Sequence, residues 1–364
     1  LAMGRRGRGT PIATFSRLAA TASKTGRWSI AGGFTMLTAF LITSFYCVIG
    51  GWTLHYIFLA LTGSLRTIDA AGAEAAFNEL LANPWLLMMW QGIFIALNVA
   101  VLAKGVKGGI ERAVTFLMPL LFILLVALAG YGLMIGDGAG TLQFLFAPDF
   151  SAVTAQTVLE AVGQAFFSVG VGMAAMITYG AYLEKSVHIP RTAYVVALSD
   201  TAVALIAGLA VFPFVFAYGV APGQGPGLVF VTLPTALAGI GGSYAAIAFF
   251  GLLAVAALTS SIALFEVFVS WWHKGEGSRV RSAIGVGGFM WVIGLGTVFS
   301  FNIASGFKPF SFVPGYREAT FFDGIDQFTA TIGLPLGGFL AAVFVGGVRG
   351  KADIAEELGV SAEG

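Results

Sequence analysis

The chain has 364 residues, of which 57% are hydrophobic and only 10% are charged, and its formal net charge is +1. Soluble domains carry about 25% charged residues, so this composition excludes the soluble globular class. It predicts an all-α polytopic membrane protein, because helices satisfy their own backbone hydrogen bonds inside a bilayer. The one cysteine, Cys47, excludes an internal disulfide.

Apolar runs that approach or exceed the roughly 20 residues needed to cross a bilayer divide the chain. They predict eight membrane spans, at about 31–62, 84–103, 113–135, 157–182, 192–219, 243–272, 282–302 and 326–348. Residues 31–348 are therefore expected to form a single transmembrane bundle, with a short basic turn at 104–112 and a folded extracellular cap at 220–242.

The opening residues, LAMGRRGRG, are typical of the cytoplasmic end of a helix whose earlier part is missing. We therefore interpret 1–30 as that helix end plus a cytoplasmic loop, and 349–364 as the cytoplasmic tail of a truncated chain.

The distribution of Lys and Arg between alternate loops predicts the orientation. Only Arg66, Lys308 and Arg317 fall on one side, and the other cations fall opposite, so the positive-inside rule makes that opposite side cytoplasmic. A multi-pass protein of the plasma (inner) membrane with both ends cytoplasmic is expected.

The stretch 160–182, EAVGQAFFSVGVGMAAMITYGAY, combines span-like hydropathy with glycines that weaken a helix. Gly170 and Gly172 come two and four residues after Ser168, and this spacing favours a helix that breaks at mid-depth. Broken helices in membranes build substrate and ion sites in transporters. An ordinary span with a glycine-rich packing face is the alternative.

Acidic residues in or near spans need a partner, a cation or an interface. Asp200 is the deepest, which favours an ion site over a structural network or a protonated carboxyl. Asp326 opens the last predicted span, where a helix-start acid and a gate are equal alternatives. Glu160 and Glu266 are interpreted as solvated interfacial groups.

Three adjacent hydroxyls, Thr259, Ser260 and Ser261, lie in the middle of another span. They can bond to the preceding turn of their own helix, or they can supply oxygen ligands. With Ser168 and Asp200 they form an oxygen-rich set that suits a hard cation such as Na⁺. Soluble catalytic motifs, including metalloprotease and phosphate-loop patterns, are absent from the sequence, so we do not expect an enzyme.

The order and spacing of several motifs resemble the bacterial branch of the neurotransmitter:sodium symporter family, whose fold is the LeuT-type inverted-repeat helical bundle. They are AMGRRGRGTP, FYCVIGGWTL, KGVKGGIERAVTFLMPLLFILL, VGQAFFSVGVGMAAMITYGAY, ALSDT, ALTSSIALFE and FDGIDQFTATIGLPLGG. The resemblance implies that the chain holds a partial bundle, from the end of the family's second helix through helices three to ten. The first helix, which supplies ligands to substrate and both sodium ions, would be missing, as would the region after the tenth.

The resemblance also implies a role for individual positions. The substrate-binding set is Ile42, Tyr46, Phe167, Ser168, Gly170, Met173, Ser260 and Leu264. Two sodium sites would be formed by Ser168, Asp200, Ala256, Thr259 and Ser260, and the extracellular gate by Phe167 and Asp326. Gly170 and Met173 replace a hydroxyl and a Phe of relatives, and Asp200 replaces an Asn.

The implied function is sodium-coupled symport of a small, apolar amino acid by alternating access, with Na⁺ as the coupling ion. The expected partners are that substrate and the lipid bilayer, with no nucleic acid. The fragment itself is expected to be inactive. Alternatives are a channel, a proton-coupled transporter of the same fold with Asp200 as the titrating group, and a non-transporting regulatory remnant.

Overall fold

The computed structural model describes residues 1–22, 26–217, 219, 225–240, 242–273, 278–313, 316–348 and 357–359, and in these ranges all regular secondary structure is helical. The polytopic all-α class is therefore confirmed. The helices that precede the first span are α1 (Ala2–Gly7) and α2 (Pro11–Thr21), and α2 is capped by the hydroxyl of Thr10, which accepts from the amide of Ala13.

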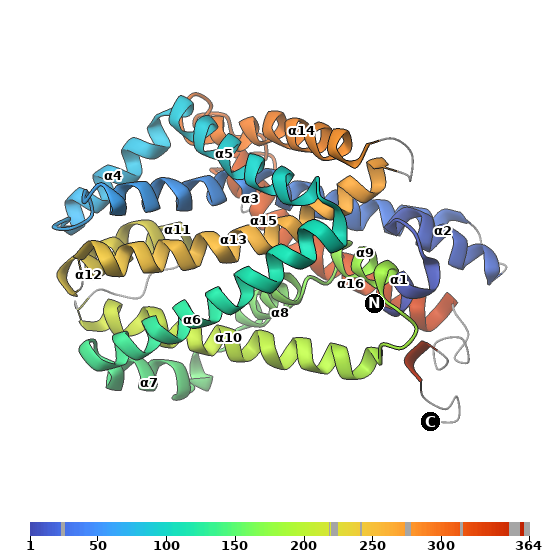
Figure 1. The fold of residues 1–364 in the computed structure, drawn as a ribbon, viewed down its shortest axis with the longest axis horizontal. Coiled ribbons are helices and arrows are strands. Elements are labelled where there is room, and N and C mark those ends of the chain that lie inside the picture. The colour runs from blue at the N-terminus through green and yellow to red at the C-terminus, as the bar shows by residue number, and fades with distance from the viewer. Residues whose placement is uncertain are drawn as a thin grey trace.

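Long helices lie side by side along the horizontal axis of Figure 1, with short helices at the ends of the bundle. The long ones are α3 (Ser29–Leu61), α5 (Pro84–Leu102), α6 (Arg112–Ile135), α10 (Ile189–Ala217), α13 (Gly242–His273) and α14 (Arg279–Ser300). The end opposite α1 and α2 carries α4 (Ala70–Ala82), α7 (Gly138–Phe146) and α12 (Leu233–Ile240).

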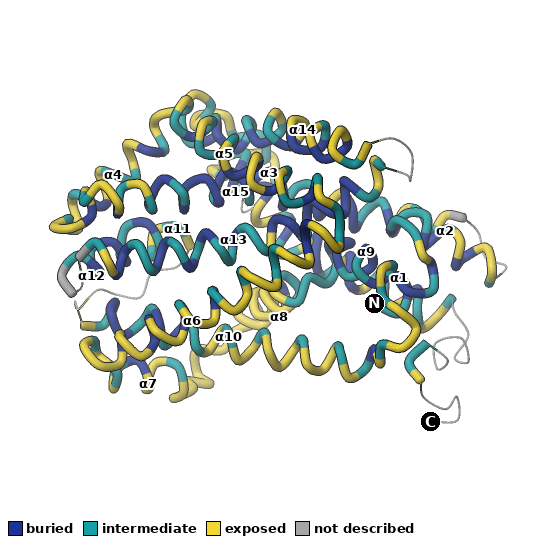
Figure 2. Tube along the Cα trace, in the orientation of Figure 1, coloured by how far each residue is buried: buried dark blue, intermediate teal, exposed yellow. Residues whose placement is uncertain are grey.

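Helix α3 lies at the centre of the bundle. In its most apolar window 61% of the residues are buried, against 6% in the corresponding window of α10. It packs against α13, α5, α14 and α2, and its residues belong to both of the larger buried clusters. Helix α10 is largely exposed up to about residue 205 (Figure 2) and more buried beyond it, so its earlier part forms an outer wall of the described bundle.

In the described part of the chain, seven uninterrupted helices are long and apolar enough to cross a membrane. The eighth predicted span, 157–182, is also helical but interrupted, as α8 (Ala155–Val169) and α9 (Ala175–Tyr182). The expectation of about eight spans therefore agrees with the structure once the broken helix is counted.

The break occupies the five residues 170–174. Gly170 caps α8 with φ 76°, Gly172 has φ 85° and Ala174 has φ 64°. These left-handed conformations suit glycine and end the helix at the place where the sequence predicts it. The alternative of an unbroken, glycine-rich span is excluded.

The last span begins earlier than predicted and is not a uniform α-helix. It consists of α15 (Phe321–Phe328), a π-helical turn at Thr329–Gly333, α16 (Leu334–Val343) and a second π turn at Phe344–Val348. The predicted turn at 104–112 is also wrong in part. A π-helical turn at Val106–Glu111 leads directly into α6 because Gly105, at φ 81°, makes the reversal alone.

The predicted cap at 220–242 is described from residue 225 to residue 240. Here α11 (Gly225–Gly227), a π turn at Leu228–Thr232 and α12 follow one another without reaching the length of a span. Phe230 is buried against Trp52 and Tyr56 of α3, and its carbonyl accepts from the Tyr56 hydroxyl at 2.8 Å. This geometry supports a folded cap, whereas the predicted tail at 349–364 lies outside the described residues apart from 357–359.

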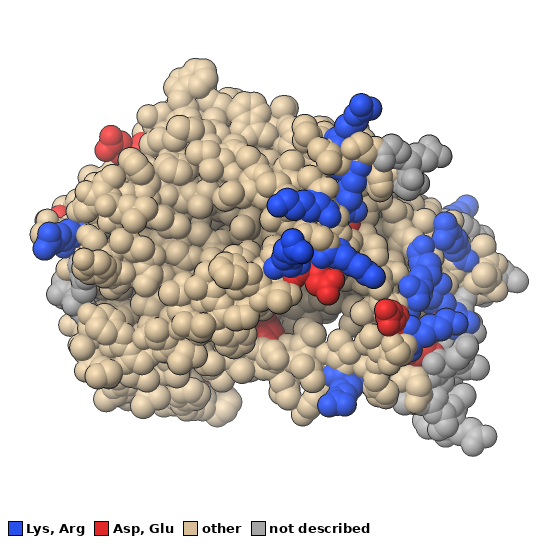
Figure 3. Space-filling view, in the orientation of Figure 1, with Lys and Arg blue, Asp and Glu red and all other residues tan. Residues whose placement is uncertain are grey.

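Charged side chains are few on the face shown in Figure 3, and Lys and Arg gather toward the end of the bundle that carries α1 and α2. The predicted cations Lys24, Lys274, Arg349 and Lys351 lie outside the described residues. The visible distribution supports the predicted orientation, which stays a prediction.

We expect Gly172→Ala to lower the stability of the folded protein by roughly 1–3 kcal/mol, because a Cβ at φ 85° is strained and would meet the backbone carbonyl of Leu334. Thermal unfolding in detergent measures the effect. Gly130→Ala in α6 is the matched control, since open space surrounds that glycine; an equal loss in both variants would contradict the role assigned to the break.

Candidate functional site

The end of α8 and the middle of α10 bring two of the predicted ion ligands together. The Ser168 hydroxyl donates to an Asp200 carboxylate oxygen at 2.8 Å. Helix α8 is set in place by a capping box in which Thr154 and Thr157 bond each other's backbone amides, and it ends just after Ser168 because of the left-handed Gly170. Ser168 is exposed and Asp200 is partly buried, so the oxygen pair is open on one side.

Part of the predicted substrate-binding set belongs to the large buried core cluster that includes the broken segment. Ile42, Met173 and Leu264 are buried in one core cluster, and Tyr46 and Phe167 pack against it. They come from α3, the broken segment and α13. The structure thus places five of the eight predicted substrate-binding residues in or against one core cluster, and their roles stay predictions.

The hydroxyls of α13 divide into different environments. Thr259 donates to the carbonyls of Val255 at 3.1 Å and Ala256 at 2.9 Å, while the buried Ser261 donates to Asn98 of α5 at 2.7 Å and to Leu258. Ser260 is exposed and its side chain interacts with the Tyr46 hydroxyl. Ser261 is therefore structural, whereas Thr259 and Ser260 keep oxygen lone pairs that can accept a cation.

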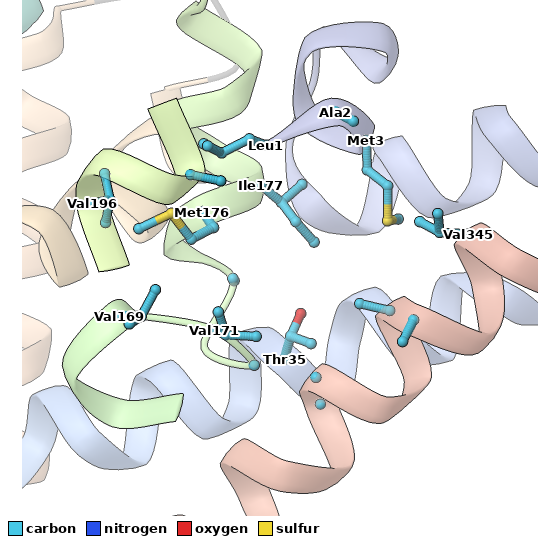
Figure 4. A pocket seen from close by; sticks show the side chains of 18 of the residues that line it. Leu1, Ala2, Met3, Thr35, Val169, Val171, Met176, Ile177, Val196 and Val345 are labelled. Atoms are coloured by element: carbon cyan, nitrogen blue, oxygen red, sulfur yellow. The ribbon is translucent and has the colours of Figure 1, made fainter. Parts of the chain in front are cut away.

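Thr259 and Ser260 line a hollow of about 530 Å³ between α6, α9 and α13, whose remaining walls include Glu111, Val114 and Tyr179. Gly170 lies elsewhere, in the wall of an apolar pocket of about 420 Å³ (Figure 4). In that view Val169, Val171 and Met176 from the broken segment lie across from Met3 and Val345. Of the predicted site residues this pocket includes Gly170 alone.

Asp326 does not start the last span. Helix α15 begins after Thr320, whose hydroxyl and amide both bond Asp323 in a capping box. Asp323 is therefore the helix-start acid, and the corresponding interpretation of Asp326 is wrong. Asp326 lies one turn further on with an exposed side chain, where the gate interpretation stays a prediction.

Glu266 was expected to be solvated, and the structure contradicts this. Its side chain is fully buried and pairs with Arg279, and the Tyr182 hydroxyl donates to its other oxygen at 2.6 Å. Arg279 also donates to the carbonyl of Leu102 at 3.0 Å. This network joins α9, α13, α14 and the end of α5. The position of Glu266 near the end of a span suggests contact with water, but partners on two other helices, Arg279 and Tyr182, bind the carboxylate instead.

Glu160 is exposed as predicted, and Gln156 donates to it at 2.9 Å. No group of three or more His, Cys, Asp or Glu side chains in the described ranges could hold a metal ion. The candidate site instead consists of two groups of oxygens: the Ser168–Asp200 pair between α8 and α10, and the Thr259 and Ser260 hydroxyls in the hollow between α6, α9 and α13.

The model of the sodium:neurotransmitter symporter family matches residues 74–358. The chain belongs to this family. Among its relatives, an uncharacterized sodium-dependent transporter of Bacillus subtilis, YhdH, is 34% identical over 335 residues, which are 91% of this chain and 72% of that protein. An uncharacterized sodium-dependent transporter of Haemophilus influenzae is 36% identical over 248 residues, which are 67% of this chain and 54% of that protein.

A solved structure with the same fold is that of MhsT in complex with L-phenylalanine. The two chains are 40% identical with a TM-score of 0.88, and the match covers 99% of this chain and 80% of MhsT. The fold is therefore that of the symporter family, as the resemblance implied. The family is one of transporters, which agrees with the expectation that the chain is not an enzyme.

Loss of one partner in the Glu266 network should strongly destabilise this family member. Arg279→Ala leaves a fully buried carboxylate without its cation, which typically costs about 3–5 kcal/mol. The double variant Glu266→Leu with Arg279→Met removes both charges and should recover most of that loss. Unfolding midpoints of the single and double variants test this, and a double variant as unstable as Arg279→Ala would contradict the charge explanation.

Proposed function

We propose that the full-length protein couples inward movement of Na⁺ across the inner membrane to uptake of a small, apolar amino acid by alternating access. The observation that carries the proposal is the Ser168–Asp200 hydrogen bond at the broken helix. It places two hard oxygen donors where a membrane helix loses its regular hydrogen bonding, and such places bind ions and substrates in transporters. The names of the relatives, which are sodium-dependent transporters, support Na⁺ as the coupling ion.

Two sodium sites are proposed from the donor chemistry. Ser168 and Asp200 would contribute to one, while the hydroxyls of Thr259 and Ser260 and the carbonyl of Ala256 would contribute to the other. The donor sets fit Na⁺ because every ligand atom is an oxygen.

The amino-acid substrate is proposed from the core cluster that includes the broken segment. Ile42, Met173 and Leu264 offer no charge to a substrate side chain, and the Tyr46 hydroxyl offers a polar contact for a carboxylate. The MhsT complex contains L-phenylalanine, which supports an apolar amino acid. Phe167 and Asp326 are proposed to close the outer side.

A proton-coupled transporter of the same fold is the second candidate, and the unusual carboxylate at Asp200 favours it. Uptake that follows pH and ignores sodium would select that candidate. A regulatory remnant would show neither dependence.

Asp200→Ala in the full-length protein should raise the Na⁺ concentration needed for half-maximal substrate binding by about tenfold, because a charged oxygen ligand is lost. Radiolabelled amino-acid binding across a sodium titration measures this shift. The matched control is Glu160→Gln, which removes an exposed carboxylate from α8, the helix that ends next to Ser168. Unchanged sodium dependence in Asp200→Ala would refute the ion-site assignment.

Met173→Ala should shift selectivity toward larger apolar amino acids, because it removes volume from the buried wall of the proposed pocket. A change of about tenfold in the ratio of binding constants for a large and a small substrate is expected. Met290→Ala, at an equally buried methionine in α14, controls for general loss of packing. A similar shift in both variants would show that Met173 does not line the pocket.

A further inference from the structure

The turn between α5 and α6 and the start of α14 meet at one end of the bundle. The Nε of Arg279 donates to the carbonyl of Leu102, and the Arg279 side chain lies 3.9 Å from where a Cβ on Gly105 would stand. Gly105 has φ 81°, so the chain can reverse against the arginine without a side chain in the way. The two helix starts are therefore held at a fixed spacing.

Four exposed cations lie in the turn or near the starts of the two helices that follow it: Lys104, Lys107, Arg112 and Arg281. Arg279 is neutralised internally by Glu266. In the described ranges none of the four exposed cations forms an ion pair, and the nearest acid in the same turn is Glu111, which is exposed as well. We refer to these four residues as the basic junction.

The cations lie at the wrong ends of their helices for the helix dipole. Val106–Ile135 and α14 both begin here, and a helix N-terminus favours negative charge. Neither start has a side-chain cap, and α14 has no acid in its first turn. The uncapped backbone N–H groups and the cations therefore both favour binding of an anion, and that anion would come from outside the described chain.

The surface next to the basic junction is apolar in the manner of a lipid-facing surface. Phe116 is four residues after Arg112 on α6 and is 71% exposed, and Ile284 is three residues after Arg281 on α14 and is 57% exposed. Residues three or four apart share a helix face. Each helix thus presents a cation at its end and an apolar side chain one turn deeper.

Aromatic residues mark the same level of the bundle. Trp271 and Trp272, at the end of α13, are 41% and 53% exposed, and the Trp272 ring lies 3.9 Å from where a Cβ on Gly285 of α14 would stand. Exposed tryptophans are enriched at the height of lipid headgroups. The basic junction is thereby placed at the membrane surface, within reach of a headgroup phosphate.

We propose that the basic junction binds the phosphate of an anionic phospholipid, such as phosphatidylglycerol, with its acyl chains along Phe116 and Ile284. Clusters of cations next to membrane helices recognise anionic headgroups. Here the two uncapped helix starts add backbone donors to that charge, and the exposed apolar side chains complement the lipid tails. This proposal does not depend on the transported substrate.

The test compares two double variants of the full-length protein in lipid nanodiscs. Lys107→Gln with Arg112→Gln removes half of the basic junction. Lys185→Gln with Arg191→Gln removes one lysine and one arginine, also exposed, from the α9–α10 turn. Native mass spectrometry and competition between phosphatidylglycerol and phosphatidylcholine measure the preference for the anionic lipid.

The junction variant should lose about tenfold in preference for phosphatidylglycerol, while the control variant should keep it. An equal loss in both variants would show a general effect of positive charge and would overturn the site, as would no loss in either. If the double variant does not fold, the single variant Lys104→Gln is measured in its place and should show a smaller loss of the same kind. Displacement of the bound lipid by inorganic phosphate alone would also count against a phospholipid site.

Discussion

Polar backbone groups inside a membrane must find partners within the protein, and this constraint governs the centre of the structure. At the break, the amides of Gly170 and Val171 bond the carbonyls of Phe167 and Phe166 at the end of α8, while α9 restarts on the carbonyl of Ala174. A Cβ on Gly172 would clash with the carbonyl of Leu334 in the last span, and a Cβ on Gly337 of that span would clash with the carbonyl of Gly172. The break therefore packs directly against the last span, whose backbone leaves no room for a side chain at position 172.

Two carboxylates in or near the spans, Glu266 and Asp200, have opposite environments. Glu266 is fully buried with a cation and a tyrosine hydroxyl on its two oxygens. Asp200 has one partner among the described residues, the hydroxyl of Ser168. A satisfied carboxylate holds helices together, whereas one with free lone pairs can bind an ion.

Much of the fold was predictable because apolar runs of the required length can hardly be arranged otherwise in a bilayer. The break was predictable as well, because Gly170 and Gly172 supply conformations that other residues avoid. The Glu266 network was not, since its partners Tyr182 and Arg279 lie on other helices and ion pairing leaves no local pattern. The last span starts earlier than predicted because a capping box formed by Thr320 and Asp323 begins the helix at Phe321. The proposed ion ligands were in part predictable from polar residues within the spans, whereas the substrate-binding residues came from the family resemblance, and the roles of both stay predictions.

The π-helical turn at Thr329–Gly333 carries a consequence for register. A π turn accommodates an additional residue compared with an α-helical turn, and each residue rotates the side-chain direction by about 100°. Asp326 lies before this turn and Gly337 after it, so the number of residues in the turn sets the direction of Gly337 relative to that of Asp326. Deleting one residue within 329–333 would keep the length needed to cross the membrane, yet it would turn one of these two positions away from its neighbour. The number of residues in this short turn is therefore as constrained as their identity.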